Sequence, residues 1–339
     1  MIGYYVHHVG RGHLRNAFCI AAALDRELTG LSSLPRPDGW PGDWIELDRD
    51  DRDGSVRDPS AHGQLHWAPL HDGGLSARMA SIAAWVDGTR PAALVVDVSV
   101  EVALFARLMG IPTVVMALPG DRSDPAHRLG YAQAEAVLAA WPAGLGGVDR
   151  DLYPWAARTH HIGGLSRFAG RPAVAPPPSR RRRVLLLQGT GGTSIGPAEV
   201  AAAAAATPDW EWQRLGPGAW SEDPWPALCA ADVVVTHAGL GALADLAAAA
   251  RPAIVIPQDR PHDEQRATAR ALADAGLAVT AANWPDDDRW PDLLAGALDV
   301  GGSGWQHWRT DGAAQRAARI IDATAGDQIT SRGRSCASR

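Results

Sequence analysis

The chain has 339 residues, of which 46% are hydrophobic, so it is long enough for about two folded domains with separate cores. Its formal net charge is −6 and all its positive charge comes from arginine, which excludes a general electrostatic attraction to nucleic acid. No apolar run approaches the roughly 20 residues that span a bilayer, and the start MIGYYVHHVG lacks the pattern of a signal peptide, so we expect a cytoplasmic protein.

The first half of the chain alternates short apolar runs with helical patterns, which predicts a parallel α/β sheet. The stretch from 48 to 72 is polar and rich in turn residues, so we expect an irregular surface segment there. The expected strands are residues 2–6, 29–33, 44–47, 93–98 and 111–116, and the expected helices are residues 14–28, 75–87, 100–109 and 129–140.

A proline-rich stretch divides the chain. Residues 171–179, RPAVAPPPS, suit neither a helix nor a central strand and therefore predict a linker. A second α/β set begins with a strand at 184–188 and ends with a helix at about 311–324. The basic run at 180–183 is most simply solvated, with contact to membrane headgroups as the alternative. The expected division is a domain at 1–168, a linker at 169–183, a second domain at 184–325 and a disordered polar tail at 326–339.

Cysteines and histidines show no local metal pattern. Cys19, Cys229 and Cys336 are odd in number and have no disulfide or ligand spacing, as expected of a reduced protein. The histidine pairs at 7–8 and 160–161 lack further ligands at suitable spacing, so we expect neither a structural metal nor a cofactor.

Residues 237–265 form the most informative stretch. A buried strand is expected at 232–236 (DVVVT), followed by the glycine turn HAGLG at 237–241, a helix at 242–250 and a further strand at 253–256. Such a turn aims backbone N–H groups and a helix N-terminus at one point, which suits an anion such as phosphate. The alternative is a plain structural turn, because many glycine turns bind nothing.

This stretch resembles the donor-binding signature of nucleotide-sugar glycosyltransferases with the GT-B fold. The families it resembles are the UDP-glycosyltransferases, the antibiotic-tailoring glycosyltransferases and the peptidoglycan N-acetylglucosaminyltransferase. Asp245 stands where their signature has glutamate, and the loop before Glu264 is a few residues longer than in the plant enzymes. The resemblance implies two Rossmann-like, doubly wound parallel-sheet domains that face a central cleft, with a final helix that crosses back to the first domain. The matching positions are His237, Gly239, Ala242, Asp245, Arg251, Pro252, Pro257, Glu264 and Gln265.

The same resemblance implies roles for the donor half. Asp245 would hold the ribose, and Glu264 and Gln265 would bind sugar hydroxyls. Trp220 would stack on the nucleobase, with core packing as the alternative. A second glycine loop at 189–194 fits a nicotinamide fingerprint poorly, because Ser194 replaces its third glycine. The expected diphosphate contacts are His237, Gly239, Leu240, Gly241, Gly191, Gly192 and Thr193.

His13 is the candidate general base. It follows the first strand at the start of a helix, and the pKa of a histidine can be tuned near neutrality. The loop GRGHLR resembles the start of the UDP-glycosyltransferases, whose histidine deprotonates the acceptor hydroxyl, and Asp97 would orient it. The alternatives are a structural or helix-capping role for His13, an N-capping role for Asp97, and His7 or His8 as the base.

We therefore expect an inverting, metal-independent transfer from a UDP- or dTDP-type sugar to a hydroxyl. The acceptor could be a small molecule such as a natural-product aglycone, a polyprenyl lipid or a glycan. Its expected contacts are His66, Trp67, His71 and the loop at 119–127. The alternatives are a nucleotide-sugar epimerase, which would need further acid and base carboxylates, and a catalytically silent nucleotide-sugar-binding partner.

Overall fold

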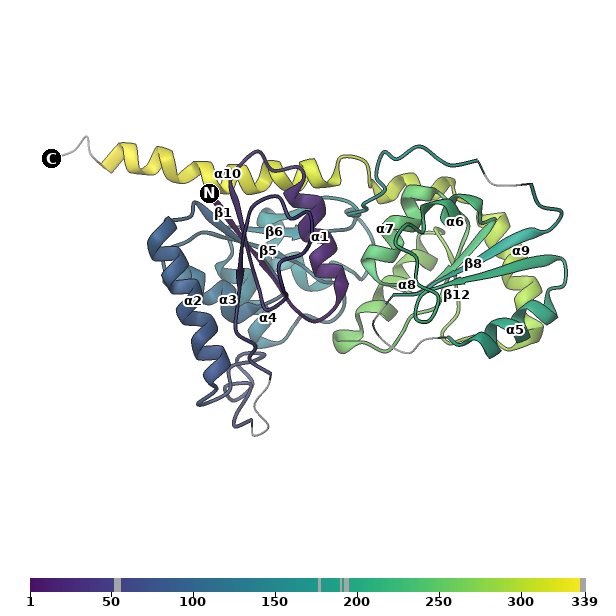
Figure 1. The fold of residues 1–339 in the computed structure, drawn as a ribbon, viewed down its shortest axis with the longest axis horizontal. Coiled ribbons are helices and arrows are strands. Elements are labelled where there is room, and N and C mark those ends of the chain that lie inside the picture. Colours follow the sequence, from purple (N-terminus) through teal and green to yellow (C-terminus); the bar gives the residue numbers. More distant parts are fainter. Residues whose placement is uncertain (52–55, 176–177, 190, 192–194, 336–339) are drawn as a thin grey trace.

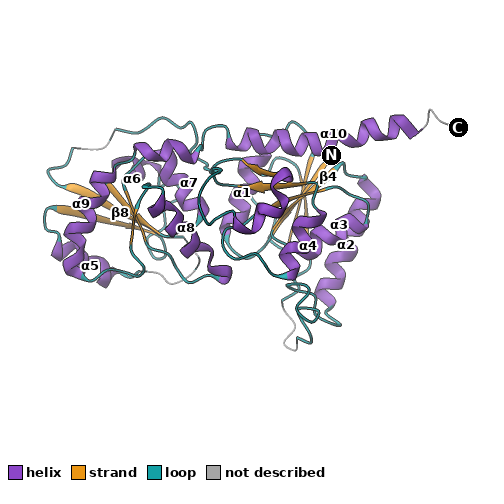
Figure 2. Ribbon diagram, turned by 180° about the vertical axis from the view of Figure 1, so that it is seen from behind, coloured by secondary structure: helices purple, strands orange, loops and turns teal. Residues whose placement is uncertain are grey.

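The structure is a computed structural model that describes residues 1–339 except 52–55, 176–177, 190, 192–194 and 336–339, and it leaves the side chains of Arg11 and 327–335 undescribed. Figure 1 shows two α/β halves side by side, with the last helix lying along the N-terminal half. Each half contains one sheet covered by helices, as Figure 2 shows from behind.

The N-terminal sheet is parallel throughout. In the described part of the chain it has seven strands in the order β3-β2-β1-β4-β5-β6-β7. The central strands β1 and β4 are fully buried and rich in valine, isoleucine and tyrosine, as expected when helices cover both faces. The elements of this half are β1 (Ile2–Val6), α1 (Arg11–Ala21), β2 (Leu28–Ser32), β3 (Asp43–Glu46), α2 (Gly73–Thr89), β4 (Ala93–Asp97), α3 (Val100–Leu108), β5 (Thr113–Met116), α4 (Pro125–Gln133), β6 (Ala136–Ala139), the 3₁₀ segment η1 (Arg150–Arg158) and β7 (Thr159–His161).

One predicted helix of this half is wrong. We expected a helix over 129–140, but α4 ends at Gln133 and Ala136–Ala139 form strand β6 between β5 and β7. Alanine favours helices, yet a short apolar run is ambiguous, and here pairing on both sides overrides the intrinsic preference. The strand β7 and the segment η1 were also missed.

The C-terminal sheet is parallel as well. Its described strands number five, in the order β12-β11-β10-β8-β9. The elements of this half are β8 (Arg182–Leu187), α5 (Pro197–Ala206), β9 (Trp210–Leu215), α6 (Trp225–Ala230), β10 (Val233–Thr236), α7 (Leu240–Ala249), β11 (Ala253–Val255), η2 (Pro261–Asp263), α8 (Glu264–Asp274), β12 (Val279–Thr280), η3 (Asp287–Arg289), α9 (Trp290–Val300), η4 (Ser303–Trp308) and α10 (Ala313–Ser335).

The strand orders determine where ligands can bind. In an open parallel sheet the crevice lies at the carboxyl ends of the strands, where the strand order reverses. In the N-terminal sheet this point lies between β1 and β4, and in the C-terminal sheet it lies between β8 and β10. The loops after these strands include residues 7–10, 98–99 and 237–239, and the predicted residues His13, Asp97, His237 and Gly239 lie in these loops or close beside them.

The last helix belongs to the N-terminal core. Ala313, Ala317, Ile321 and Ala325 of α10 are buried in a cluster with residues of β1 and α1, and Arg26 forms an ion pair with Asp322. We expected a disordered tail from residue 326, whereas α10 continues to Ser335. Extension of an existing helix needs no new nucleation, so α10 can continue beyond the residues that pack on the first domain. Among the described residues no helix is long and apolar enough to cross a membrane.

Candidate active site

His13 and Asp97 form a hydrogen-bonded pair at the N-terminal crevice. The helix predicted over 14–28 begins at Arg11, so His13 lies in the first turn of α1, and Asp97 is the last residue of β4. The His13 Nδ1 lies 2.8 Å from the Asp97 Oδ1, and the Asp97 side chain is fully buried. Because the carboxylate accepts the Nδ1 proton, the neutral imidazole has its lone pair on Nε2.

Burial lowers the pKa of His13, but the charge and hydrogen bond of Asp97 and the charge of Glu264 outweigh it, so the net pKa is raised. Glu264 begins α8 in the other domain. A base with a carboxylate behind it and a raised pKa is a stronger proton acceptor than an ordinary histidine.

The alternatives His7 and His8 differ from His13 in their partners. The His7 Nδ1 accepts a hydrogen bond from the Val9 amide at 3.1 Å, and burial with its cationic neighbours lowers the pKa of His7 to about 4. The His8 Nε2 lies 3.5 Å from Asp51, whose carboxylate is already paired with Arg49. The geometry therefore favours His13, the histidine with a buried carboxylate at hydrogen-bond distance.

The backbone beside Asp97 is strained. Val98 has a φ of 62°, a conformation that a β-branched residue rarely adopts. Such strain gathers at functional sites, where the surrounding structure holds it. Ser99, and not Asp97, caps α3, so the capping role that we considered for Asp97 is wrong.

A cavity of about 280 Å³ opens beside this crevice. Its lining combines the apolar side chains of Val98, Met79 and Trp67 with the polar side chains of Arg78 and Glu101. Of the predicted acceptor contacts, His66 and Trp67 line the cavity and His71 does not. The Glu101 carboxylate fixes the first two, because it accepts their backbone N–H groups at 2.8 and 3.0 Å.

His237 lies at the C-terminal crevice, at the end of β10. Its Nδ1 donates to the Ile256 carbonyl at 2.9 Å, and its buried Nε2 has no partner among the described residues. Burial lowers the pKa of His237, the carbonyl raises it, and the charge of Arg260 lowers it; the net pKa is lowered.

The N-terminus of α7 lies directly after His237. Gly239 occupies the N-cap position and no side chain caps the helix, so the first N–H groups of Leu240 and Gly241 are free to meet an anion. The predicted contact Gly191 lies in the loop after β8, whereas Gly192 and Thr193 lie outside the described residues. These diphosphate contacts stay predictions.

Two arginines that we did not predict lie at these glycine turns. The Arg260 guanidinium is so close to Gly191 that an added Cβ would lie 2.2 Å from its Nη2. An added Cβ on Gly241 would likewise lie 3.3 Å from the Nη1 of Arg15. In a chain without lysine, the arginine two residues after His13 and the arginine in the loop before Glu264 were the only local signals.

Asp245, the predicted ribose contact, lies between the domains. Its Oδ2 accepts from Arg15 of α1 at 2.9 Å, and its Oδ1 accepts from Ser166 at 2.8 Å. The side chain is 2% exposed, and burial raises its pKa while Arg15, Ser166 and Arg167 lower it; the net pKa is raised. In this arrangement both carboxylate oxygens are occupied by the domain interface, so the ribose role stays a prediction.

The other predicted donor residues begin α8 or lie in the loop after β9. The Glu264 Oε2 accepts from Arg122 of the N-terminal domain at 3.1 Å, and the Gln265 Oε1 accepts from the Gln258 amide at 3.0 Å. Trp220 is 50% exposed, so it does not fill a core. The loop at 119–127 packs against the segment before α8, since the backbone N–H of Asp121 donates to the His262 carbonyl at 2.7 Å.

Comparison with known proteins matches parts of this chain to glycosyltransferases. Residues 222–285 match the glycosyltransferase family 28 C-terminal domain, a segment that contains the α7 turn and Glu264-Gln265. The chain is 30% identical over 214 residues to the UDP-N-acetylglucosamine--N-acetylmuramyl-(pentapeptide) pyrophosphoryl-undecaprenol N-acetylglucosamine transferase of Clavibacter sepedonicus, which is 56% of this chain and 56% of that protein. The equivalent enzyme of Rubrobacter xylanophilus is 32% identical over 198 residues, 51% of this chain and 56% of the relative. The chain thus spans about half the length of the relatives that it matches.

Solved structures match over nearly the whole chain. The glycotransferase of kitacinnamycin has a TM-score of 0.67 at 19% identity, covering 96% of this chain and 98% of that one. The calicheamicin glycosyltransferase CalG4 has a TM-score of 0.66 at 16% identity, with the same coverage. The MurG of Acinetobacter baumannii has a TM-score of 0.62 at 16% identity, over 95% of this chain and 99% of that one. The chain has the GT-B fold. The predicted fold class and the resemblance to glycosyltransferases with the GT-B fold are confirmed.

Proposed function

We propose that this protein is an inverting glycosyltransferase that moves a sugar from a nucleotide-diphosphate donor to an acceptor hydroxyl. The observation that supports the proposal most strongly is the contact between helix α1 of the N-terminal domain and helix α7 of the C-terminal domain. Helix α1, which presents His13, contacts helix α7, whose uncapped N-terminus follows His237, and Arg15 links the two helices through Asp245. A base and an anion site therefore lie on opposite sides of one domain interface.

In this proposal His13 removes the proton of the acceptor hydroxyl through its Nε2. Asp97 holds the ring in the required tautomer and stabilises the imidazolium that forms. The acceptor oxygen attacks the anomeric carbon from the side opposite the diphosphate, which inverts the configuration there. The fully buried carboxylate and the strained Val98 support a preorganised base.

The diphosphate leaves toward the C-terminal crevice. The N–H groups at the start of α7 would donate hydrogen bonds to it and stabilise its developing charge, as preorganised donors do in other enzymes. The guanidinium of Arg260 supplies a full positive charge beside the Gly191 turn. These residues supply charge stabilisation from the chain itself.

We propose a small acceptor with an apolar body and few polar groups. The cavity of about 280 Å³ lies near the lower end of the volumes of roughly 300–1,000 Å³ that are typical of small-molecule sites. Apolar side chains such as Met79 and Val102 favour an aglycone-like or lipid-like body. A UDP- or dTDP-type donor fits the names of the relatives and structures that match the chain.

The carboxylates at the cleft argue for transfer over epimerisation. Asp97 is bound to His13, Asp245 to Arg15 and Ser166, and Glu264 to Arg122. An epimerase would need free acid and base groups around the sugar, whereas an inverting transfer needs a single base.

The deciding experiment pairs binding with turnover. We expect one of UDP, dTDP or GDP, or one of their sugars, to raise the melting temperature of the protein, since a ligand of the native state stabilises it. The nucleotide sugar that does so should then be consumed with a hydroxylated aromatic acceptor panel, with release of the nucleoside diphosphate. A melting shift without any turnover would favour the silent binding partner, and no shift at millimolar ligand would overturn the proposal.

A further inference from the structure

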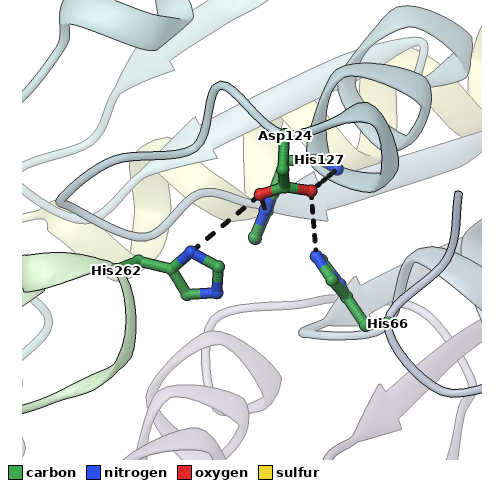
Figure 3. Close-up of side chains that lie close together, drawn as sticks. All are labelled: His66, Asp124, His127 and His262. Atoms are coloured by element: carbon green, nitrogen blue, oxygen red, sulfur yellow. Dashed lines mark hydrogen bonds and ion pairs between the residues drawn. The ribbon is translucent and has the colours of Figure 1, made fainter. Parts of the chain in front are cut away.

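Three histidines and one aspartate converge at the boundary between the domains. Figure 3 shows Asp124 at the centre, with the rings of His66, His127 and His262 directed at its carboxylate. One nitrogen or oxygen from each of the four lies within 4.8 Å of all the others. His66 comes from the irregular segment, Asp124 and His127 from the start of α4, and His262 from the loop before α8 in the other domain.

The contacts around the carboxylate are close to those of a metal site. The His66 Nε2 lies 3.1 Å from the Asp124 Oδ1, and the His262 Nδ1 lies 3.9 Å from the Oδ2. Zinc binds imidazole nitrogen and carboxylate oxygen at about 2.0–2.2 Å in a tetrahedron, so neighbouring ligand atoms stand roughly 3.4 Å apart. To reach this spacing, the short contact between His127 Nδ1 and Asp124 Oδ2 has to open, and the other ligand atoms, which now lie within 4.8 Å of one another, have to draw together.

A simpler explanation covers only part of the cluster. Asp124 caps α4, because its Oδ1 accepts the backbone N–H of His127 at 3.0 Å. Capping accounts for the aspartate, but it needs no imidazole. Three rings from three separate segments around one carboxylate are a complete set of four ligands.

We propose that His66, Asp124, His127 and His262 bind one divalent transition-metal ion of the zinc class, which joins the two domains. The set of three imidazoles and one carboxylate suits zinc rather than magnesium or calcium, which prefer oxygen ligands. The side chains of His66, Asp124 and His262 are 35%, 33% and 32% exposed, so an ion can enter from solvent. The site is separate from the His13–Asp97 pair and does not depend on the proposed transfer.

One neighbour must adjust when the ion binds. The Nε2 of His127 lies 3.3 Å from the Nη1 of Arg122, whereas a metal on Nδ1 would leave a proton on Nε2. Arg122 keeps its bonds to the Pro119 carbonyl and to Glu264 if the His127 ring shifts away from Nη1. The adjustment therefore breaks the longest of its hydrogen bonds and leaves its contact across the domains in place.

An ion here would act on the donor half of the cleft. His262 stands two residues before Glu264, and its carbonyl already accepts the Asp121 amide of the N-terminal domain. A metal on the His262 side chain would add a second fixed point to this crossing. It would hold the start of α8 against the N-terminal domain in the arrangement described here.

The test is zinc binding by the untagged full chain, measured by calorimetry and by metal content after dialysis. We expect one zinc per chain, and a visible absorption spectrum of tetrahedral type with Co²⁺. The variants His262→Asn and His66→Ala should bind zinc at least about tenfold more weakly, since loss even of a ligand's supporting contact costs about 10–100-fold. Asparagine suits position 262 because it tolerates the left-handed backbone there, where φ is 63°.

His62→Asn is the matched control, because the backbone at position 62 is also left-handed, with a φ of 56°. His62 also faces an aspartate, with its Nδ1 3.4 Å from Asp58, but its side chain is 91% exposed and lies outside the cluster. Zinc should raise the melting temperature of the wild type and of His62→Asn, and should raise that of His262→Asn by less, because weaker binding stabilises less. Equal zinc affinity in all four proteins, or none in the wild type, would overturn the proposal. A variant whose melting temperature without zinc matches the wild type shows that its loss of zinc is not a loss of folding.

Discussion

The two crevices of this molecule are prepared for their tasks to different degrees. At the N-terminal crevice the base is complete, because His13 is held by the buried Asp97 beside a strained Val98. At the C-terminal crevice the donors at the start of α7 and the Nε2 of His237 have no partner among the described residues. One half is assembled in advance, while the other presents open hydrogen-bonding groups that a ligand has to complete.

A ligand therefore meets a complete base at the N-terminal crevice, whereas it has to complete the anion site at the C-terminal crevice. The proton acceptor needs no rearrangement, so its removal should affect turnover directly. The anion site at the start of α7 is complete only when a ligand binds. Its variants should therefore change the affinity for the nucleotide sugar and the pH dependence of that affinity. The following predictions test that division, beginning with the largest effect.

Replacement of the base should have the largest effect. His13→Ala should lower kcat by about 10²–10⁴-fold, the usual contribution of general base catalysis, with little change in nucleotide affinity. Steady-state kinetics and nucleotide calorimetry on the same protein measure the two quantities. His160→Ala, at an exposed position on the edge strand β7, is the matched control. Full turnover by His13→Ala would remove this histidine from the mechanism.

Replacement of His237 should change affinity. Its Nδ1 donates to Ile256, so Nε2 can donate to a phosphate only after the ring gains a proton. The pKa of His237 is lowered in the free protein and should rise on binding, so the affinity for a nucleotide sugar should increase as pH falls from about 8 to 6. His237→Gln should bind about 10–100-fold more weakly at pH 6 and lose this pH dependence, as calorimetry at several pH values would show. An unchanged pH dependence in the variant would place the proton elsewhere.

Loss of Arg15 should destabilise the domain interface. Arg15→Ala removes one partner of the buried Asp245, which should cost about 1–3 kcal/mol of unfolding free energy. The pKa of Asp245 is already raised, so a protonated Asp245 contributes stability at low pH that is lost as pH rises through its folded pKa. The deficit of the variant should therefore grow with pH in urea unfolding, and Asp245→Asn should reduce that growth. A deficit independent of pH would assign the loss to packing.

The pH profile of turnover should report on Asp97. The base works when neutral, and the pKa of His13 is raised by Asp97 and Glu264 against the effect of burial, so kcat/KM should rise with pH with a midpoint above the ordinary value of about 6.5. Asp97→Asn should move the midpoint downward in addition to lowering the rate. Protonated His13 also adds stability that is complete below the unfolded pKa and is lost as pH rises through the folded pKa. A midpoint that stays in place would show that Asp97 does not set this pKa.

The donor half of the site was easier to predict from the sequence than the His13–Asp97 pair. The donor turn was recognisable because residues 237–245 are contiguous, so the strand, the glycines and the acid keep a fixed spacing. His13 and Asp97 are 84 positions apart, and their pairing was expected only from the resemblance to the UDP-glycosyltransferases. The double α/β fold was predictable from alternating patterns, whereas β6 was not, because Ala136–Ala139 acquire strand structure from their neighbours.

What could not be predicted are contacts made between distant segments. Local spacing showed no metal ligands, yet positions 66, 124, 127 and 262 meet across the domain boundary. Asp245 has the position of a ribose contact in the motif, and only the fold shows that Arg15 and Ser166 occupy both of its oxygens. A sequence pattern identifies residue types, but the way the two domains pack determines which distant residues contact each other.

The placement of α10 has a consequence for how this protein is made. Its Ala317 and Ile321 are fully buried against the first domain, although they follow the whole second domain in the sequence. The first domain therefore cannot bury its apolar surface until the second has been synthesised. The two halves cannot be expressed as separate pieces without exposing that surface, and a growing chain leaves it exposed until α10 has been synthesised.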